Sequence, residues 1–310
     1  MLYIAYDSIY CHPLPEGHRF PMLKYELIPE QLIYEGTCTP ENFFSPKNFM
    51  SDDELTKFIL MAHEQAYLDD LLNVRISPKM ERRIGFPVTK KLVERELVIT
   101  KGTIQCCHHA FQNGVAMNIA GGTHHAYPDK GEGFCLLNDV GVASHYLLSK
   151  GLAKKILVID LDVHQGNGTA VMFQDNPQIF TFSMHGGENY PLKKEISDVD
   201  VPLPTYTTDN AYLGALYGAL PDLIKNVEPD FLFYVSGVDI LESDKLGKLN
   251  VSIQGCKIRD EFVFKTAFEA ELPIVVTMGG GYSPRIADIV EAHCNTFRVA
   301  ELMYRDLTIL

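Results

Sequence analysis

Two aspartates and a histidine follow one apolar run of the chain. In VIDLDVHQGNGT (158–169) these residues are Asp160, Asp162 and His164. Residues two apart in extended backbone point the same way, so Asp162 and His164 can reach one ion. Asp239, at the end of the apolar run DFLFYVSGVD, is the best third ligand, because a buried strand rarely ends in an unpaired carboxylate. The alternative is that Asp162 and Asp239 only cap helices.

This set of ligands favours one catalytic metal ion. Two carboxylates and an imidazole suit Zn²⁺ or Fe²⁺ and leave a position open for water and substrate. A two-metal hydrolase of this type would carry a further aspartate two residues after His164, where Gly166 stands. Ile240 and Leu241 follow Asp239, so no second carboxylate is available there either.

Two glycine-rich segments add groups that could handle protons. GGTHHAYPDKGEGFCLLND (121–139) contains the adjacent His124 and His125, in a loop where glycines allow backbone to approach a ligand closely. One imidazole could act as a general base and later protonate a leaving amine. MGGGYS (278–283) ends near Tyr282, whose hydroxyl could donate to an oxyanion. The spacing and lysine of a phosphate-binding loop are missing.

The elements that must position these residues alternate along the chain. Five apolar runs predict buried strands: 2–6, 155–162, 178–185, 230–239 and 273–282. Helical periodicity predicts helices at 51–72, 89–114, 137–151, 210–227, 259–271 and 285–305. We therefore predict an α/β fold with a mainly parallel central sheet, flanked by helices, in a single domain over residues 1–310. The active site is expected at the C-terminal ends of the strands.

Composition limits the function classes. The net charge is −13, from 27 basic and 40 acidic residues, and no basic stripe indicates direct nucleic-acid binding. No apolar run is long enough to span a membrane. The seven cysteines lack a framework spacing, and the first residues lack the features of a signal peptide. These features predict a cytoplasmic protein with reduced thiols, and they indicate nothing about its oligomeric state.

Five motifs together resemble one known family. GGTHHA, GEGFCLLND, VIDLDVHQGNGT, SGVDILESDKLGKL and GGGYS occur in the order of the histone deacetylase superfamily, which has the arginase–deacetylase fold. The resemblance covers nearly the whole chain. DLDVHQGNG and the segment after GVD look most like the class IV branch and its bacterial relatives.

The resemblance implies roles for the residues in these motifs. Zinc would be bound by Asp162, His164 and Asp239. His125 would be the general base and acid, and Tyr282 would polarise the amide carbonyl. His124 would be an electrostatic neighbour that hydrogen-bonds Asp160. A structural potassium ion would lie beside the site, on Asp160, Ser183 and the backbone carbonyls of Asp162, His164 and Met184.

The resemblance also implies how a substrate is held. Phe134 and Tyr190 would wall a tunnel for an acyl-lysine stem, and the Gly133 carbonyl would accept from the substrate amide. Arg19 would line an internal cavity for the departing acid. Leu246 stands at the gatekeeper position that carries glutamate in polyamine deacetylases, which argues against a cationic polyamine.

One position departs from the pattern of many family members. Asn167 replaces an aspartate partner of His125, and this should make the imidazolium of His125 less stable. The class IV branch shares the asparagine, so activity is still expected.

The predicted function is zinc-dependent removal of acetyl or longer acyl groups from lysine in a peptide or protein. The alternatives are deacetylation of a small acylated amine and an inactive acyl-lysine-binding module.

Overall fold

The apolar runs form a parallel sheet at the centre of the molecule. The structure, a computed structural model, describes residues 1–305. Eight strands lie in the order β2-β1-β3-β8-β7-β4-β5-β6, and every pair is parallel. The predicted α/β class and its parallel sheet are confirmed. The strands are β1 (Tyr3–Ala5), β2 (Phe43–Phe44), β3 (Val115–Asn118), β4 (Ile156–Asp160), β5 (Ile179–Gly186), β6 (Val199–Leu203), β7 (Phe231–Val235) and β8 (Ile274–Thr277).

The differences between predicted and observed strands lie mostly at strand ends. The predicted strands 155–162, 230–239 and 273–282 extend past the ends of β4, β7 and β8, because their last residues leave the sheet as loops. Two of these loops carry Asp162 and Asp239. The sequence does not predict β2, β3 or β6. β2 has only two residues, and β6 contains a proline and lies at an edge of the sheet, where proline is tolerated.

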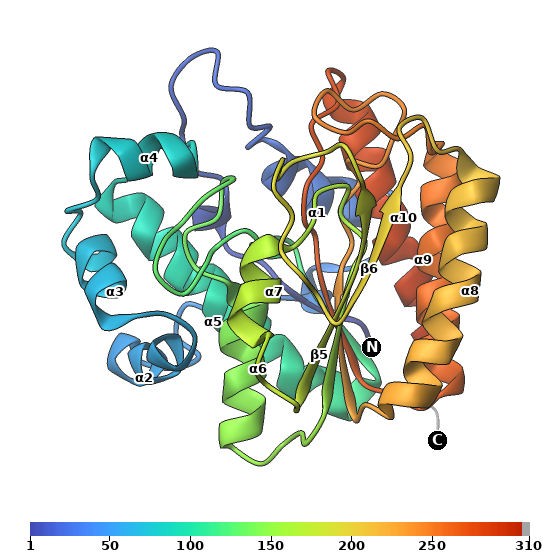
Figure 1. Cartoon of the computed structure of the whole chain (residues 1–310), viewed down its shortest axis with the longest axis horizontal. Helices are drawn as coiled ribbons and strands as arrows, with labels where there is room; N and C mark the ends of the chain where they lie inside the picture. Colours follow the sequence, from blue (N-terminus) through green and yellow to red (C-terminus); the bar gives the residue numbers. More distant parts are fainter. Residues whose placement is uncertain (306–310) are drawn as a thin grey trace.

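Helices cover both faces of the sheet (Figure 1). Helices α8, α9 and α10 lie together on one side, and α5, α6 and α7 lie on the other. Helix α9 begins before its predicted start at residue 259. The α-helices of residues 1–305 are α1 (Lys24–Tyr34), α2 (Asp52–Ala62), α3 (Gln65–Leu72), α4 (Pro78–Ile84), α5 (Lys90–Asn113), α6 (Asp139–Ser149), α7 (Asn167–Phe173), α8 (Asp209–Val227), α9 (Ile253–Glu269) and α10 (Ile286–Tyr304).

None of the helices in residues 1–305 has both the length and the hydropathy needed to cross a membrane. The predicted single domain includes residues 306–310, which lie outside the described residues.

The helix predicted over 51–72 is interrupted at His63. Its Nδ1 donates to the carbonyl oxygen of Tyr127 (2.9 Å), and its Nε2 accepts from the backbone N–H of Asn138 (2.9 Å). Burial lowers the pKa of His63 to about 4, so the ring stays neutral and can make both bonds. The break between α2 and α3 therefore anchors the glycine-rich loop that follows the two histidines.

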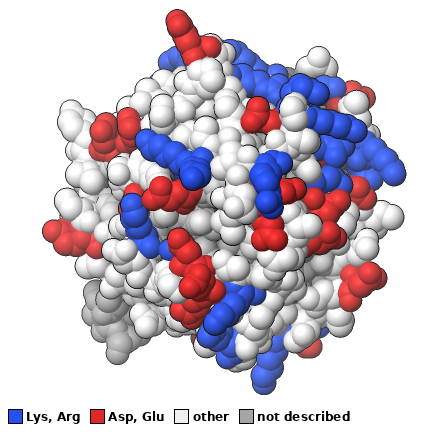
Figure 2. Space-filling model, turned by 90° about the vertical axis from the view of Figure 1, so that its left-hand side faces the viewer, with Lys and Arg blue, Asp and Glu red and all other residues white. Residues whose placement is uncertain are grey.

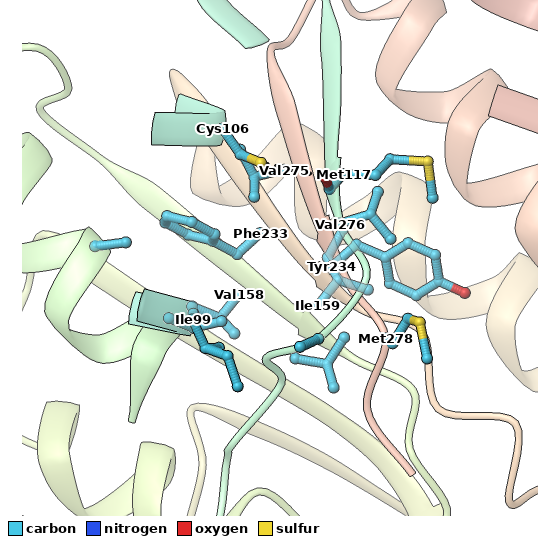
Figure 3. Packing of buried hydrophobic residues seen from close by; sticks show 14 of the residues in the cluster. Ile99, Cys106, Met117, Val158, Ile159, Phe233, Tyr234, Val275, Val276 and Met278 are labelled. Carbon is cyan, nitrogen blue, oxygen red and sulfur yellow. Dashed lines mark hydrogen bonds between the residues drawn. The ribbon is translucent and has the colours of Figure 1, made fainter. Parts of the chain in front are cut away.

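Successive strand residues pack on opposite faces of the sheet (Figure 3). Val158 and Phe233 lie on the side of Ile99 from α5, whereas Ile159 and Tyr234 lie on the other side. This period of two is the pattern expected of buried strands covered on both faces. All seven cysteines are free thiols, and six of them are buried.

A buried arginine joins α9 to the strand ends. Arg259 and Asp260 are fully buried and form an ion pair with Nη2 2.8 Å from Oδ1. Arg259 also donates to the carbonyl oxygen of Gly237 (2.5 Å), in the loop that leads to Asp239. Asp260 accepts from the hydroxyl of Tyr234 (2.5 Å). This pair therefore supports the loop that supplies a predicted metal ligand.

Arg259→Met is expected to lower the free energy of unfolding by about 3–5 kcal/mol, because Asp260 would be left as an unpaired buried charge. The double change Arg259→Met/Asp260→Leu should cost less, since both charges are then absent. Urea unfolding followed by circular dichroism measures both. Equal losses in the single and double variants would contradict this account.

Candidate active site

The loops after β4 and β7 bring the three predicted metal ligands together. Ligand atoms of Asp162, His164 and Asp239 all lie within 4.8 Å of one another, and the three residues are buried. His164 Nδ1 lies 3.0 Å from Asp162 Oδ1 and 3.1 Å from Asp239 Oδ2. Backbone N–H groups of Gly280 and Val163 donate to the other carboxylate oxygens (2.7 and 2.9 Å). Neither aspartate is the N-cap of a helix, so the capping alternative is wrong.

The charges in this triad suit a divalent cation. Burial and the charge of Asp162 raise the pKa of Asp239 to about 7. Burial opposes ionisation of Asp162 as well, but the charges of His124 and His164 hold its pKa well below the usual range. A Cβ on Gly280 would lie 2.1 Å from Asp239 Oδ2, so glycine keeps space beside the carboxylates. One divalent ion would neutralise both carboxylates, and the donor set is one that zinc accepts. The residues therefore fit the predicted ion.

The pKa values of the two adjacent histidines are shifted in opposite directions. His124 Nδ1 donates to Asp160 Oδ2 (2.7 Å), the hydrogen bond that was expected. Burial would lower the pKa of His124, but the charges of Asp160 and Asp162 outweigh it and raise the pKa to about 9. Burial, then the positive charges of His124 and His164, lower the pKa of His125 well below its ordinary value. His125 is therefore a neutral base near pH 7.

Asn167 links His125 to a buried carboxylate, Glu132, for which the sequence predicts no role. His125 Nδ1 donates to Asn167 Oδ1 (2.6 Å), which leaves Nε2 as the basic atom. Asn167 Nδ2 donates to Glu132 Oε1 and to the hydroxyl of Tyr127, both at 2.9 Å. Glu132 lies in the quoted GEGFC segment and is only 6% exposed. An amide can accept from His125 and donate to Glu132 at once, whereas an aspartate at position 167 would repel Glu132.

Asn167→Asp combined with Glu132→Gln is expected to move the acidic limb of the kcat/KM profile to higher pH. A carboxylate at position 167 stabilises the imidazolium of His125 and raises its pKa, so the neutral base is lost at a higher pH than in the parent. Asn167→Asp alone should lower activity, because it places two buried carboxylates side by side. The profile would be measured between about pH 5 and 9. An unshifted acidic limb in the double variant would count against the role given to position 167.

The glycine loop after β8 brings Tyr282 to the same place. Gly281 has φ +155°, a conformation that favours glycine. The N–H of Tyr282 donates to Asp244 Oδ2 (2.6 Å), and its ring centre lies 6.3 Å from that of His164. Burial, then the charge of Asp239, raise the pKa of Tyr282 well above 10. The phenol therefore keeps its proton and can act as a donor.

An outer pocket of about 730 Å³ gives access to these groups, and His125, His164 and Tyr282 are among its lining residues. Gly133 has φ +57°, and a Cβ there would lie 2.5 Å from the ring of His125. The Tyr190 ring centre lies 5.1 Å from that of His125. The four residues predicted to contact substrate all line this pocket: Gly133, Phe134, Tyr190 and Leu246.

The structure corrects the prediction for Arg19. A smaller inner cavity of about 40 Å³ is lined by Arg95 and Phe20 among others, but not by Arg19. Arg19 is exposed and lines the outer pocket, where its guanidinium carbon lies 5.0 Å from the ring centre of Phe134. The apolar ring of Phe20 packs inward, while the charge of Arg19 remains in contact with water.

Comparison with known proteins agrees with this geometry. The profile of the histone deacetylase domain matches residues 18–297. The chain belongs to the histone deacetylase family. It is 41% identical to an uncharacterized protein of Picosynechococcus, over 97% of this chain and 99% of the relative. It is 29% identical to histone deacetylase 2 of Arabidopsis thaliana, over 88% and 72% of the two chains. Its identity to the acetoin utilization protein AcuC of Staphylococcus aureus is 27%, over 91% and 77%.

Solved structures share the fold of this deacetylase-family chain. A structure of an HDAC homolog complexed with SAHA superimposes with a TM-score of 0.80 and 24% identity, covering 96% of this chain and 82% of the other. The HD domain of HDA15 gives a TM-score of 0.78 at 19% identity, covering 97% and 88%. The predicted superfamily is confirmed, and the named relatives do not point specifically to its class IV branch.

Proposed function

We propose that the chain is a zinc-dependent amide hydrolase that removes acetyl or longer acyl groups from lysine side chains. One observation carries the proposal: a buried divalent-ion ligand set adjoins one pocket that also contains a neutral histidine base and a tyrosine hydroxyl. Membership of the histone deacetylase family supports the same chemistry. We also propose that residues 1–310 form a single domain, that the protein is cytoplasmic, and that it is most similar to the class IV branch.

His125 accepts and returns the proton. Asp162, His164 and Asp239 would hold the ion, which supplies Lewis acidity toward an amide carbonyl and an attacking water. His125 Nε2 takes a proton from the attacking water, since its Nδ1 proton is engaged by Asn167. His125 then gives the proton to the amide nitrogen as the C–N bond breaks, and the products are a lysine amine and a carboxylic acid.

The pocket residues orient the amide. The Tyr282 hydroxyl donates to the amide oxygen, where negative charge develops during attack. The Gly133 carbonyl accepts from the amide N–H, and the rings of Phe134 and Tyr190 flank the aliphatic stem. Leu246 offers no charge to a second amine, so a neutral stem fits better than a polyamine.

The identity of the ions is also part of the proposal. Zinc and Fe²⁺ both accept two carboxylates and an imidazole. Asp160 and Ser183 are paired neighbours on β4 and β5, which supports a potassium ion between them. The proposed potassium ligands are Asp160, Ser183 and the backbone carbonyls of Asp162, His164 and Met184.

A substrate panel on zinc-loaded protein tests the proposal. One lysine peptide would carry acetyl, butyryl, octanoyl or myristoyl groups, with N-acetylated polyamines alongside and a hydroxamate inhibitor as control. Hydroxamate-sensitive turnover of an acyl-lysine peptide is expected. Turnover of polyamines alone would assign a small acylated amine as substrate. Binding without turnover of any amide would instead favour the acyl-lysine-binding module.

A further inference from the structure

The rim of the outer pocket is basic although the chain has a net charge of −13. Five lysines and arginines line the pocket against two glutamates. These cations come from the N-terminal loop, α4 and the loops that precede Gly133 and follow β5. Figure 2, which shows the side of the molecule that carries α4, has lysine and arginine side chains gathered at its upper right edge. The five cations that line the pocket are Arg19, Arg82, Arg83, Lys130 and Lys193.

Both glutamates are already engaged by other residues of the pocket wall. Glu132 is 6% exposed, accepts from Asn167 (2.9 Å) and pairs with Arg83 (3.3 Å). Glu195 Oε1 accepts from the hydroxyl of Tyr127 (3.1 Å). Both glutamates therefore help to hold the wall together, and two carboxylates against five cations leave the rim with a net positive charge.

Three of the cations lack an acidic partner. Arg19, Arg82 and Lys193 form no ion pair with an aspartate or glutamate anywhere in residues 1–305. Arg19 is held against the wall by its contact with the ring of Phe134. Unpaired charges of one sign around a concave, poorly polarisable wall focus the electric field and attract ligands of opposite sign. In a chain with excess acid, this concentration of unpaired cations indicates a ligand.

This field acts on the part of a substrate that stays outside the tunnel. The amide and the aliphatic stem that pass between Phe134 and Tyr190 are neutral. We infer, on the basis of the proposed deacylase function, that the preferred substrate carries a carboxylate or phosphate beside its acylated amine. The favoured source is an acyl-lysine flanked by aspartate or glutamate, because the cations are spread over several segments around the mouth and suit an extended peptide. A lysine- or arginine-rich peptide is repelled by the same field.

Matched peptides test this inference. Three acetyl-lysine peptides of equal length would have acidic, neutral or basic flanks, and free Nε-acetyl-lysine would be compared with its α-methylamide. Both kcat/KM and Kd, from fluorescence anisotropy of labelled peptides, would be measured at low and high salt. At low salt, kcat/KM for the acidic peptide should be higher than that for the basic peptide by about 10-fold or more, and its Kd should be lower. Added salt should reduce this difference.

Charge-neutralising variants provide the control. Arg82→Gln/Lys193→Gln removes two exposed rim charges, and the preference for acidic flanks should fall several-fold. Lys57→Gln/Lys225→Gln makes the same change in net charge on α2 and α8, outside the pocket lining, and should leave the preference unchanged. Unaltered circular dichroism confirms that both pairs fold.

The outcomes separate this inference from the proposed function. Equal kcat/KM and Kd for the three peptides, or a preference for the basic one, would overturn the inference while turnover upholds the deacylase. Tighter binding of the acidic peptide without turnover would uphold the inference and count against the deacylase. A charge effect confined to free acetyl-lysine would assign the anion to a small molecule instead of a peptide.

Discussion

Tyr282→Phe is expected to lower kcat by about 10² or more, with little change in KM. In the proposed mechanism the lost hydroxyl is the donor to the amide oxygen as negative charge develops there, so the loss falls on the transition state. Nothing in the metal triad changes, so the affinity for zinc should equal that of the parent. Steady-state kinetics on an acetyl-lysine peptide, with metal content measured on the same sample, checks this.

Tyr190→Phe is the matched control for this prediction. The Tyr190 hydroxyl donates to Glu132, and its ring lines the same pocket. Removing that hydroxyl should reduce kcat far less than removing that of Tyr282. A Tyr282→Phe protein with the parent's kcat would remove this residue from the chemistry.

Asp239→Ala is expected to abolish tight binding of a divalent ion. The change leaves two protein ligands, Asp162 and His164, where catalytic zinc sites ordinarily use three. Zinc per chain after dialysis, measured by atomic emission, should fall from about one toward zero. The thermal stabilisation that zinc gives to the parent should disappear as well, because an ion stabilises only a folded state that binds it.

Asp139→Asn provides a control at a buried carboxylate outside the triad. Asp139 accepts hydrogen bonds from Thr103 and Thr123 and is not one of the clustered ligands. That variant should still bind zinc at parental stoichiometry. One zinc per chain in the Asp239→Ala protein would refute its assignment as a ligand.

The convergence of the candidate site residues could be predicted from the sequence because the sheet is parallel. Carboxyl ends of parallel strands meet at one edge, so polar residues after separate apolar runs had to converge there. Asp162, Asp239 and Tyr282 come from three such runs and reach one site. Strand lengths were less predictable, since an apolar loop that leaves the sheet has the same composition as the strand before it.

Other features depend on contacts between segments far apart in the chain. Glu132 has no role that can be predicted from the sequence, because its partners, Asn167 and Arg83, come from separate elements. The direction of Arg19 depends on how an irregular loop packs its neighbouring aromatic ring. Helix α4 is not among the predicted helices, although its ends carry local signals. Pro78 follows a serine cap at its start, and a left-handed glycine ends it.

Removal and return of the metal tests the central claim most directly. Protein depleted of divalent ions by a chelator would be assayed on an acetyl-lysine peptide, then titrated with Zn²⁺. We expect hydrolysis to disappear on depletion and to return in proportion to zinc, reaching its maximum at about one ion per chain. Undiminished hydrolysis in depleted protein would contradict the account, as would zinc binding at one ion per chain with no cleavage of any acyl-lysine peptide.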